Sequence, residues 1–453
     1  MPYLFNLVYL LLILLALPWL VWQAVRKGKY REGYAAKFLG RVPRRSGEKT
    51  CLWLHAVSVG EVNLLAPLLQ KIERQRPEWQ CVLSTTTTAG MRVAQKKYAG
   101  LAVFYCPLDF SWAVRTAMRR IRPDLLVLAE LELWPNLVRA ARDHGARVAV
   151  VNGRLGERSF GGYRRIRWLV KRLLGEIDLL AVQDEAYADR FLRLGARPES
   201  VRVTGSLKYD GAETDRLNPA TVHLAELAGL DNDDAVLLAG STQEPEEAYC
   251  LETYRQLRGR WPRLRLVIVP RHPERFAAVA RLLDESRLRW QRRSRLEAEG
   301  PDRSARVLLV DALGELSAWW GTARIAFVGG SLGTRGGQNM IEPAAYGAAV
   351  SFGPNTWNFR DVVDRLLERR AAVVVRDQEE LTAFVGQCLE KPEEAATQGR
   401  RAQELVREQL GATERTLDLL AGLLEAPPGA APPGHISARG PLGAVAADGR
   451  GRL

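Results

Sequence analysis

The sequence is poor in the residues that hold metal ions and form disulfides. Its 453 residues include five cysteines and five histidines. The cysteines contain no CxxC pair and the histidines do not cluster, so the ligand spacings of structural zinc sites are missing. Three cysteines lie in apolar, strand-like runs and are interpreted as core residues of a protein in a reducing compartment. No DxD-like motif follows a predicted strand. We therefore expect no metal and no other cofactor.

Charged side chains are absent from residues 1–25, and residues 4–25 are nearly all apolar. About 20 such residues suffice to cross a bilayer as a helix. A cleaved signal peptide would need a basic segment before the apolar run and a small-residue cleavage site after it, and neither is present. The sequence therefore predicts an uncleaved transmembrane anchor over residues 1–25. Basic residues follow at once, which places the body of the protein in the cytoplasm.

Positive charge is in excess. The chain has 65 lysines and arginines against 52 aspartates and glutamates, a formal net charge of +13. This balance indicates an anionic partner: nucleic acid, a membrane surface, or phosphorylated and carboxylated substrates. One segment, residues 161–177, interleaves five basic side chains with tryptophan, leucine and isoleucine. It fits an anionic membrane interface or an ordinary packed helix with a solvated basic face, and the pattern favours neither.

The length indicates two or three domains. Short apolar runs alternate with helical segments, which is typical of βαβ units and parallel sheets. We predict thirteen strands, at residues 51–57, 81–86, 102–107, 125–130, 147–153, 179–183, 201–206, 235–241, 264–270, 307–312, 325–330, 348–353 and 371–377. A polar stretch near residues 210–234 separates two doubly wound domains, with a site expected at the carboxyl ends of the strands. The predicted parts are a basic linker (26–49), a first domain (50–215), a second domain (216–425) and a disordered tail (426–453).

Glu61 follows the first predicted strand. Together with Ser58 it forms the Ser-x-x-Glu pattern of a capping box, which needs no function. A carboxylate in a first helical turn is stabilised in its charged form and is a weaker base. A catalytic role would require burial in a cleft. The local pattern leaves both interpretations open.

Two further strand ends in the first domain carry charged side chains. Glu130 and Glu132 lie at the exit of the 125–130 run, in an apolar setting that does not favour carboxylates without partners. One of the two is explained equally well as a helix-start acid. Lys208 follows the last strand of the domain, where it is either a surface residue or points toward the site.

A glycine-rich turn stands out in the second domain, over residues 329–342. Such turns leave backbone N–H groups free to receive a phosphate. Glu342, in the first helical turn after it, is placed to accept hydrogen bonds from the hydroxyls of a ribose. Arg271 follows another strand and supplies a fixed positive charge. These features predict a nucleotide site.

Nine segments, in order, resemble the bacterial 3-deoxy-D-manno-octulosonic acid (Kdo) transferases. They are WLHAVSVGE (53–61), ELELWPN (130–136), NGRLGERSF (152–160), TGSLKYD (204–210), AGST (239–242), PRHPERF (270–276), GEL (314–316), FVGGSL (327–332) and GGQNMIEPA (336–344). The resemblance implies a GT-B glycosyltransferase, with two Rossmann-like domains that face a cleft. It further implies transfer of Kdo from CMP-Kdo to a lipid A precursor at the cytoplasmic face of the inner membrane.

The resemblance also implies roles for single residues. Glu61 matches the general base, and Glu130 and Lys208 match residues that stabilise the transition state. The segments that contact CMP are matched by Pro270, Arg271, Leu313, Gly314, Glu315, Asn339, Met340, Ile341 and Glu342. This chain departs from the family pattern at Gln243, Gln338 and Asn355, where histidine is expected, and at Leu313, where methionine is usual.

The sequence therefore predicts an inverting Kdo transferase. Its leaving group, CMP, has a phosphate that we expect Arg271, Lys208 and the helix start at Asn339 to stabilise without a metal. The expected partners are CMP-Kdo, a lipid A precursor and the anionic inner-membrane surface, but no nucleic acid. The alternatives are another GT-B enzyme that uses a UDP-sugar and a membrane-tethered, non-catalytic lipid-binding homologue.

Overall fold

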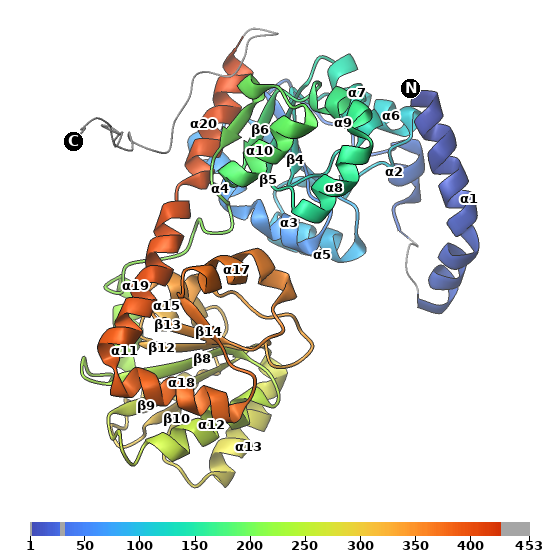
Figure 1. The fold of residues 1–453 in the computed structure, drawn as a ribbon. Coiled ribbons are helices and arrows are strands. Elements are labelled where there is room, and N and C mark those ends of the chain that lie inside the picture. Colours follow the sequence, from blue (N-terminus) through green and yellow to red (C-terminus); the bar gives the residue numbers. More distant parts are fainter. Residues whose placement is uncertain (1, 28–31, 427–453) are drawn as a thin grey trace, which may run out of the picture. The chain divides into compact units, whose positions relative to one another are not determined.

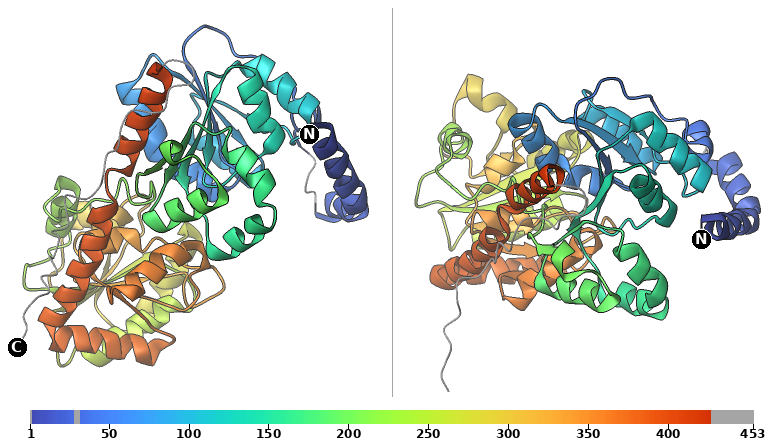
Figure 2. Two further views of the ribbon diagram at one scale, coloured as in Figure 1. Left: turned by 45° about the horizontal axis from the view of Figure 1, so that its top comes forward. Right: turned by 90° about the horizontal axis from the view of Figure 1, so that it is seen from above.

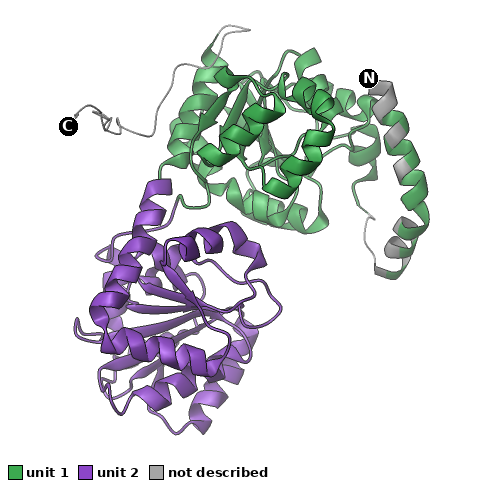
Figure 3. Cartoon of the chain, in the orientation of Figure 1, with its two compact units in different colours: residues 1–210, 410–453 green, residues 211–409 purple. Residues whose placement is uncertain are grey.

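The chain forms two compact units in the computed structural model, which describes residues 2–27 and 32–426. Unit 1 comprises Met1–Asp210 and Leu410–Leu453, and unit 2 comprises Gly211–Gln409 (Figure 3). Within the described residues, each unit contains one seven-stranded sheet in which every strand pair is parallel. The predicted α/β class is confirmed.

The sheet of unit 1 has the order β3-β2-β1-β4-β5-β6-β7. Its inner strands β1, β4 and β6 are buried on both faces, as expected for a parallel sheet covered by helices. All seven strands predicted for this part of the chain are confirmed. They are β1 (Cys51–His55), β2 (Gln80–Thr85), β3 (Ala102–Tyr105), β4 (Leu125–Ala129), β5 (Arg147–Gly153), β6 (Leu179–Val182) and β7 (Val201–Val203).

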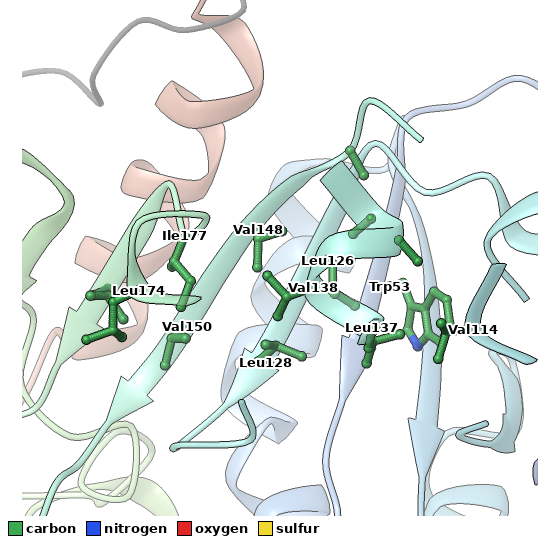
Figure 4. Close-up of a cluster of buried hydrophobic side chains, with 14 of the residues drawn as sticks. Trp53, Val114, Leu126, Leu128, Leu137, Val138, Val148, Val150, Leu174 and Ile177 are labelled. Atoms are coloured by element: carbon green, nitrogen blue, oxygen red, sulfur yellow. The ribbon is translucent and has the colours of Figure 1, made fainter. Parts of the chain in front are cut away.

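Helices cover both faces of this sheet (Figures 1 and 2). The helices of unit 1 are α1 (Pro2–Lys27), which packs against α6 and does not cover the sheet, α2 (Tyr34–Leu39), α3 (Val59–Leu64), α4 (Ala66–Gln75), α5 (Thr88–Lys97), α6 (Ser111–Ile121), α7 (Pro135–Asp143), α8 (Glu157–Arg165), α9 (Arg167–Leu174), α10 (Glu185–Leu194) and α20 (Ala412–Glu425), with the 3-10 turn η1 (Pro198–Ser200). Alternate residues of each strand point to opposite faces. Trp53, Leu126 and Val148 therefore meet α6, α7 and α9 on one face (Figure 4), while Leu54 and Val127 pack toward α4 and α20 on the other.

The sheet of unit 2 has the order β10-β11-β9-β8-β12-β13-β14. Its strands are β8 (Ala235–Thr242), β9 (Leu264–Pro270), β10 (Trp290–Arg292), β11 (Val307–Leu309), β12 (Ile325–Val328), β13 (Ala349–Phe352) and β14 (Ala372–Val374). Six of them were predicted. The prediction missed β10, because this edge strand has only three residues, all half-buried, and carries no apolar run.

Helices of unit 2 lie on both faces of its sheet as well (Figure 2). They are α11 (Pro219–Leu227), α12 (Glu246–Leu257), α13 (Phe276–Glu285), α14 (Leu296–Glu299), α15 (Leu316–Trp320), α16 (Ile341–Ala345), α17 (Arg360–Glu368), α18 (Gln378–Glu390) and α19 (Pro392–Gln409), with the 3-10 turns η2 (Pro273–Arg275), η3 (Arg293–Arg295) and η4 (Trp357–Phe359). The side chains of α12, α13 and α18 form one core layer with β8, β9 and β11.

The last described helix, α20, belongs to unit 1, whereas the sequence placed residues 216–425 in one domain. Three leucines at helical spacing, Leu417, Leu420 and Leu423, are at most 2% exposed in the core layer of β1 and β4. At the start of the helix, the Asp210 carboxylate accepts hydrogen bonds from the backbone N–H groups of Gly411, at 2.8 Å, and of Thr413. An apolar face and a half-buried carboxylate at the helix start thus hold α20 in unit 1.

The N-terminal segment forms α1. In the part of the chain that the structure describes, no helix is long and apolar enough to cross a membrane, so the predicted transmembrane anchor over residues 1–25 is not confirmed. The predicted basic linker, 26–49, contains the short helix α2. The predicted disordered tail lies outside the described residues from residue 427 onward.

Both units have a point at which the chain changes direction across the sheet. In unit 1, β2 lies on one side of β1 and β4 on the other; in unit 2, β9 and β12 flank β8 in the same way. The loops that leave the carboxyl ends of such neighbouring strands diverge, and doubly wound folds bind ligands there. Glu61 follows β1, Glu130 follows β4, and the glycine-rich turn follows β12.

Candidate active site

Three residues at strand ends have a strained backbone. Glu130, Asn152 and Ser241 have φ near 55°, in the left-handed region that non-glycine residues rarely occupy. They lie directly after β4 and within the last two residues of β5 and β8. Each such residue costs of the order of 1–3 kcal/mol and persists where surrounding contacts impose it, often at functional sites.

Glu61 lies at the start of α3 and is half-buried. Its Oε2 accepts the Val57 N–H at 2.8 Å, and its Oε1 accepts the Ser58 hydroxyl at 2.9 Å. The Glu61 N–H in turn donates to Ser58 Oγ at 3.4 Å, which completes a capping box. Burial raises the pKa of Glu61, although the hydrogen bonds that its carboxylate accepts from the Val57 N–H and the Ser58 hydroxyl lower it. Each carboxylate oxygen has a second lone pair, so the capping contacts do not use up its capacity as a base.

Glu130 lies between two cations. Its Oε1 is 3.7 Å from Lys208 Nζ, and its Oε2 is 3.6 Å from Arg154 Nε. All three side chains are between 22% and 39% exposed, so the group is accessible to a ligand. The structure thus brings Glu130 and Lys208 together, and it adds Arg154, which the sequence did not single out.

Glu132 is a second carboxylate close to Glu61. Burial, reinforced by the negative charge of Glu61, raises the pKa of Glu132 to about 7, against the hydrogen bond that Trp134 Nε1 donates to its Oε2 at 3.1 Å. The Glu130 charge acts in the same direction. Unit 1 therefore gathers three carboxylates and two cations at the ends of β1, β4, β5 and β7.

Asn152 holds the loop that carries Lys208. Its Oδ1 accepts the N–H of Leu207 at 2.9 Å, and its backbone carbonyl accepts from Gln183 Nε2 at 3.1 Å. Asn152 is fully buried. Its hydrogen bond with Leu207 holds the loop after β7 at the residue directly before Lys208.

In unit 2, Arg271 and the glycine-rich turn are joined. Arg271 follows Pro270, the last residue of β9, and its Nε donates to Gln338 Oε1 at 3.1 Å. Gln338 directly precedes Asn339, whose Nδ2 donates to Glu342 Oε1 at 2.9 Å. Burial raises the pKa of Glu342. The structure therefore brings the segment of Pro270 and Arg271 next to the segment from Asn339 to Glu342, two of the three segments predicted to contact CMP. Within the second segment, Met340 and Ile341 are buried.

The third segment, Leu313 to Glu315, follows β11 and is held by a different set of hydrogen bonds. Arg293 donates from Nε and Nη2 to the two oxygens of Glu315 at 2.9 and 2.8 Å, and Trp319 Nε1 donates to Oε2 at 3.1 Å. Gly314 has a φ of 87°, and Leu313 is 69% exposed. Glu315 thus anchors a loop whose exposed tip is Leu313.

The prediction that the glycine-rich turn leaves its backbone N–H groups free is wrong for the first residues of the turn. The N–H groups of Gly330, Ser331 and Leu332 are not free to receive a phosphate, because all three donate to the buried carboxylate of Glu246. The sequence could not reveal this contact, since Glu246 is 84 to 86 residues away in the chain.

The three departures from the expected histidines surround this same turn. A Cβ built on Gly330 would lie 3.2 Å from the Gln338 side chain and 3.3 Å from Gln243 Nε2. Asn355 Nδ2 donates to the Leu332 carbonyl at 3.2 Å. Uncharged amides therefore line one turn.

Comparison with known proteins agrees with the motifs. The family model of the 3-Deoxy-D-manno-octulosonic-acid transferase (kdotransferase) matches residues 32–211. The 3-deoxy-D-manno-octulosonic acid transferase of Haemophilus influenzae is 33% identical over 409 residues, 89% of this chain and 94% of that protein. That of Bordetella pertussis is 34% identical over 419 residues, again 89% and 94%. Among solved structures, UDP-GlcNAc 2-epimerase from Neisseria meningitidis bound to UDP-GlcNAc covers 80% of this chain and 99% of its own, with a TM-score of 0.50 and 13% identity, which shows a shared fold alone.

The raised pKa of Glu132 predicts a pH-dependent cost to stability. A carboxyl whose pKa is higher in the folded than in the unfolded chain binds more protons when folded, so stability falls as the pH rises from the ordinary value of 4.5 to about 7 and is then constant. Replacing Glu132 with glutamine removes this titration. We expect the Tm difference between Glu132→Gln and the unaltered protein to shift in favour of the variant between about pH 5 and pH 8.

The matched control is Glu157→Gln, in the same unit, because the Glu157 side chain is 87% exposed. Melting curves of the three proteins across this pH range measure the effect. Parallel pH dependence in Glu132→Gln and the unaltered protein would show that Glu132 ionises normally.

Proposed function

The chain belongs to the 3-deoxy-D-manno-octulosonic acid transferase family, and we propose that it is an inverting glycosyltransferase that moves Kdo from CMP-Kdo to a lipid A precursor in lipopolysaccharide biosynthesis. The observation that carries this proposal is the convergence of Glu61, Glu130 and Lys208 at the switch point of unit 1. A transferase that uses a UDP-sugar would share the fold, and a non-catalytic lipid-binding homologue would have no need of these side chains.

Glu61 acts as the general base in this mechanism. It takes the proton from the acceptor hydroxyl, whose oxygen forms a bond to the anomeric carbon of Kdo while the bond from that carbon to the CMP oxygen breaks. Burial supports this role because it raises the pKa of Glu61 toward the working pH. The contacts with Val57 and Ser58 fix the carboxylate before the acceptor arrives.

Glu130 and its two cations supply the electrostatic part. Lys208 and Arg154 lie on either side of Glu130, one facing each of its two carboxylate oxygens. We propose that Lys208 stabilises negative charge that develops on the leaving group and that Glu130 orients Lys208. Fixed charges of this kind stabilise a transition state without having to reorganise.

The donor nucleotide belongs to unit 2 in this proposal. Arg271 binds the CMP phosphate, Glu342 accepts the ribose hydroxyls, and the loop with exposed Leu313 contacts the base. No metal is required, since the cations of the chain balance the phosphate. The GT-B arrangement, in which two domains face a cleft, is also part of the proposal.

We further propose that the enzyme works on the cytoplasmic face of the inner membrane and contacts its anionic surface through α8 and α9. Residues 161–177 contain the end of α8 and the whole of α9, and Ile166 separates the two helices. Ile166 and Trp168 are 43% and 65% exposed and lie among exposed basic side chains, while Val170 and Leu174 are buried. An exposed tryptophan among basic residues suits a lipid headgroup region.

One assay separates the candidate functions. The purified protein is incubated with a lipid A precursor and either CMP-Kdo or UDP-GlcNAc. We expect a Kdo-bearing lipid from CMP-Kdo alone. A product from UDP-GlcNAc would favour the UDP-sugar reading, and no product from either donor would favour the lipid-binding homologue.

The role of Glu61 is tested by Glu61→Gln. Glutamine also serves in a capping box, so the fold should be kept, whereas loss of a positioned base should lower turnover by a factor of about 10² or more. CMP binding should be unchanged. The control is Asp377→Ala at the N-cap of α18, where Asp377 Oδ1 accepts the Glu380 N–H at 2.8 Å; it should cost about 1 kcal/mol of stability and leave turnover unchanged. Near-normal turnover by Glu61→Gln would leave the residue as a cap.

The nucleotide assignment is tested by two variants and three ligands in calorimetry. Glu342→Ala should weaken CMP and bind 2′-deoxy-CMP about as poorly, because the acceptor that recognises the hydroxyl is gone. Arg271→Ala should weaken CMP but leave cytidine, which has no phosphate, almost unaffected. Full preference for the ribonucleotide in Glu342→Ala would refute the assignment of Glu342.

The membrane surface is tested after deletion of residues 1–25. The shortened protein should still bind anionic vesicles at low salt and release them as salt increases, because charge attraction is screened. Ile166→Ser together with Trp168→Ser should weaken this binding further. Complete loss of vesicle binding on deletion alone would remove α8 and α9 from the membrane contact.

A further inference from the structure

A buried carboxylate lies beneath the glycine-rich turn of unit 2. Glu246, the first residue of α12, is 1% exposed. Its Oε2 accepts the N–H groups of Gln243 and Gly330 at 2.9 and 2.7 Å, and its Oε1 accepts those of Ser331 and Leu332 at 2.9 and 3.0 Å. Four backbone donors thus fill a carboxylate that has about four acceptor positions.

Backbone N–H groups that converge in this way form a site for an anion. Here the anion is a side chain of the protein itself. Glycine is needed for the approach: a Cβ on Gly329 would lie 2.7 Å from Glu246 Oε2 and 2.6 Å from the Cα of Thr242. The turn is therefore built around the carboxylate, and a phosphate would have to displace a buried charge to use these donors.

The turn held by Glu246 is linked to the side chain of Arg271. The Gly330 carbonyl accepts the Gly337 N–H at 2.8 Å, and Gly337 precedes Gln338, which accepts from Arg271 Nε at 3.1 Å. A continuous chain of hydrogen bonds and covalent neighbours runs from the buried Glu246 carboxylate to the exposed guanidinium.

A second branch runs from the same turn to the loop after β13. The Ser331 carbonyl accepts the Asn355 N–H at 2.9 Å, and Ser331 Oγ accepts the Gly353 N–H at 2.8 Å. Asn355 also donates from its side chain to Leu332. Two strand-end loops are thus fixed by one carboxylate.

We propose that Glu246 is a positioning residue for the donor nucleotide: it fixes the turn over Gly330 to Leu332 and, through Gln338, places Arg271 for the CMP phosphate. The identity of the ligand rests on the proposed function. Glu246 does not touch the nucleotide, and the turn N–H groups bind Glu246, not the phosphate.

The unaltered protein provides the first test. Amide hydrogen exchange at Ser331 and Leu332 should be slow without nucleotide, since these N–H groups already donate to a buried acceptor, and added CMP should change it little. Fast exchange that becomes slow when CMP is added would show that the turn binds the phosphate, and would overturn the proposal. This measurement needs no variant.

The second test is Glu246→Gln. An amide presents an NH2 group to two N–H donors, so half of the contacts are lost and the turn shifts. We expect the Kd for CMP and the KM for CMP-Kdo to rise by about tenfold or more. Turnover at saturating donor should stay within about threefold, because lost ground-state binding raises KM alone.

The matched control is Asp234→Asn. Asp234 is 4% exposed in the same unit and accepts from Arg265 Nε at 2.7 Å and Arg306 Nη1 at 2.9 Å, but it precedes β8, at the amino ends of the strands. It should lower the Tm and leave the KM for CMP-Kdo unchanged. Equal rises of KM in both variants would show general destabilisation and overturn the assignment.

The proposed function and this inference fail in different ways. If the unaltered protein does not bind CMP, the donor assignment falls and the role of Glu246 falls with it. If the unaltered protein binds CMP and Glu246→Gln binds it equally well, the role of Glu246 alone is refuted.

Discussion

The site geometry depends on buried carboxylates that accept backbone N–H groups where loops leave the sheets. Glu246 accepts four such groups in unit 2. In unit 1, Asp109 accepts the N–H groups of Asn136 and Leu137 at the start of α7, at 3.0 and 2.8 Å, and burial raises the pKa of Asp109 to about 6. Unpaired buried N–H groups are costly. A carboxylate satisfies several of them at once and thereby fixes a loop.

The Asp109 cluster also joins α1 to the segment that follows Glu130 and Glu132. Tyr9 donates its hydroxyl to Asp109 Oδ2 at 3.0 Å, and Asn6, in an otherwise apolar stretch, exchanges hydrogen bonds with Ser111 at 2.8 and 2.9 Å. Polar side chains in such a helix are costly without partners. The hydrogen bonds with Ser111 therefore explain why a polar residue stands at position 6. Together with the contact between Tyr9 and Asp109, they attach α1 to the rest of unit 1.

The strands could be predicted from the sequence, whereas the side chains that hold the loops after them could not, for one physical reason. A buried parallel strand is a local apolar run, and thirteen of the fourteen were visible; β10 is a short polar edge. Residues after those strands, such as Glu130 and Lys208, could be placed by topology. Arg154, Arg293 and Glu246 could not, because their partners are distant in sequence and nothing local distinguishes them from surface charges. The same holds for α20, because its leucines could pack in the core of either unit, and only the folded structure shows that they join unit 1.

Glu61 shows why a helix start can serve both structure and chemistry. Capping draws the carboxylate back onto Val57 and Ser58 and so fixes its position, while the hydrogen bonds lower its pKa. Burial and the nearby Glu130 charge act in the opposite direction. The outcome is a carboxylate that is held rigidly by the fold yet binds a proton more readily than an exposed cap would. The cap and the base are therefore compatible, because the same contacts that stabilise α3 hold the carboxylate in place for proton transfer.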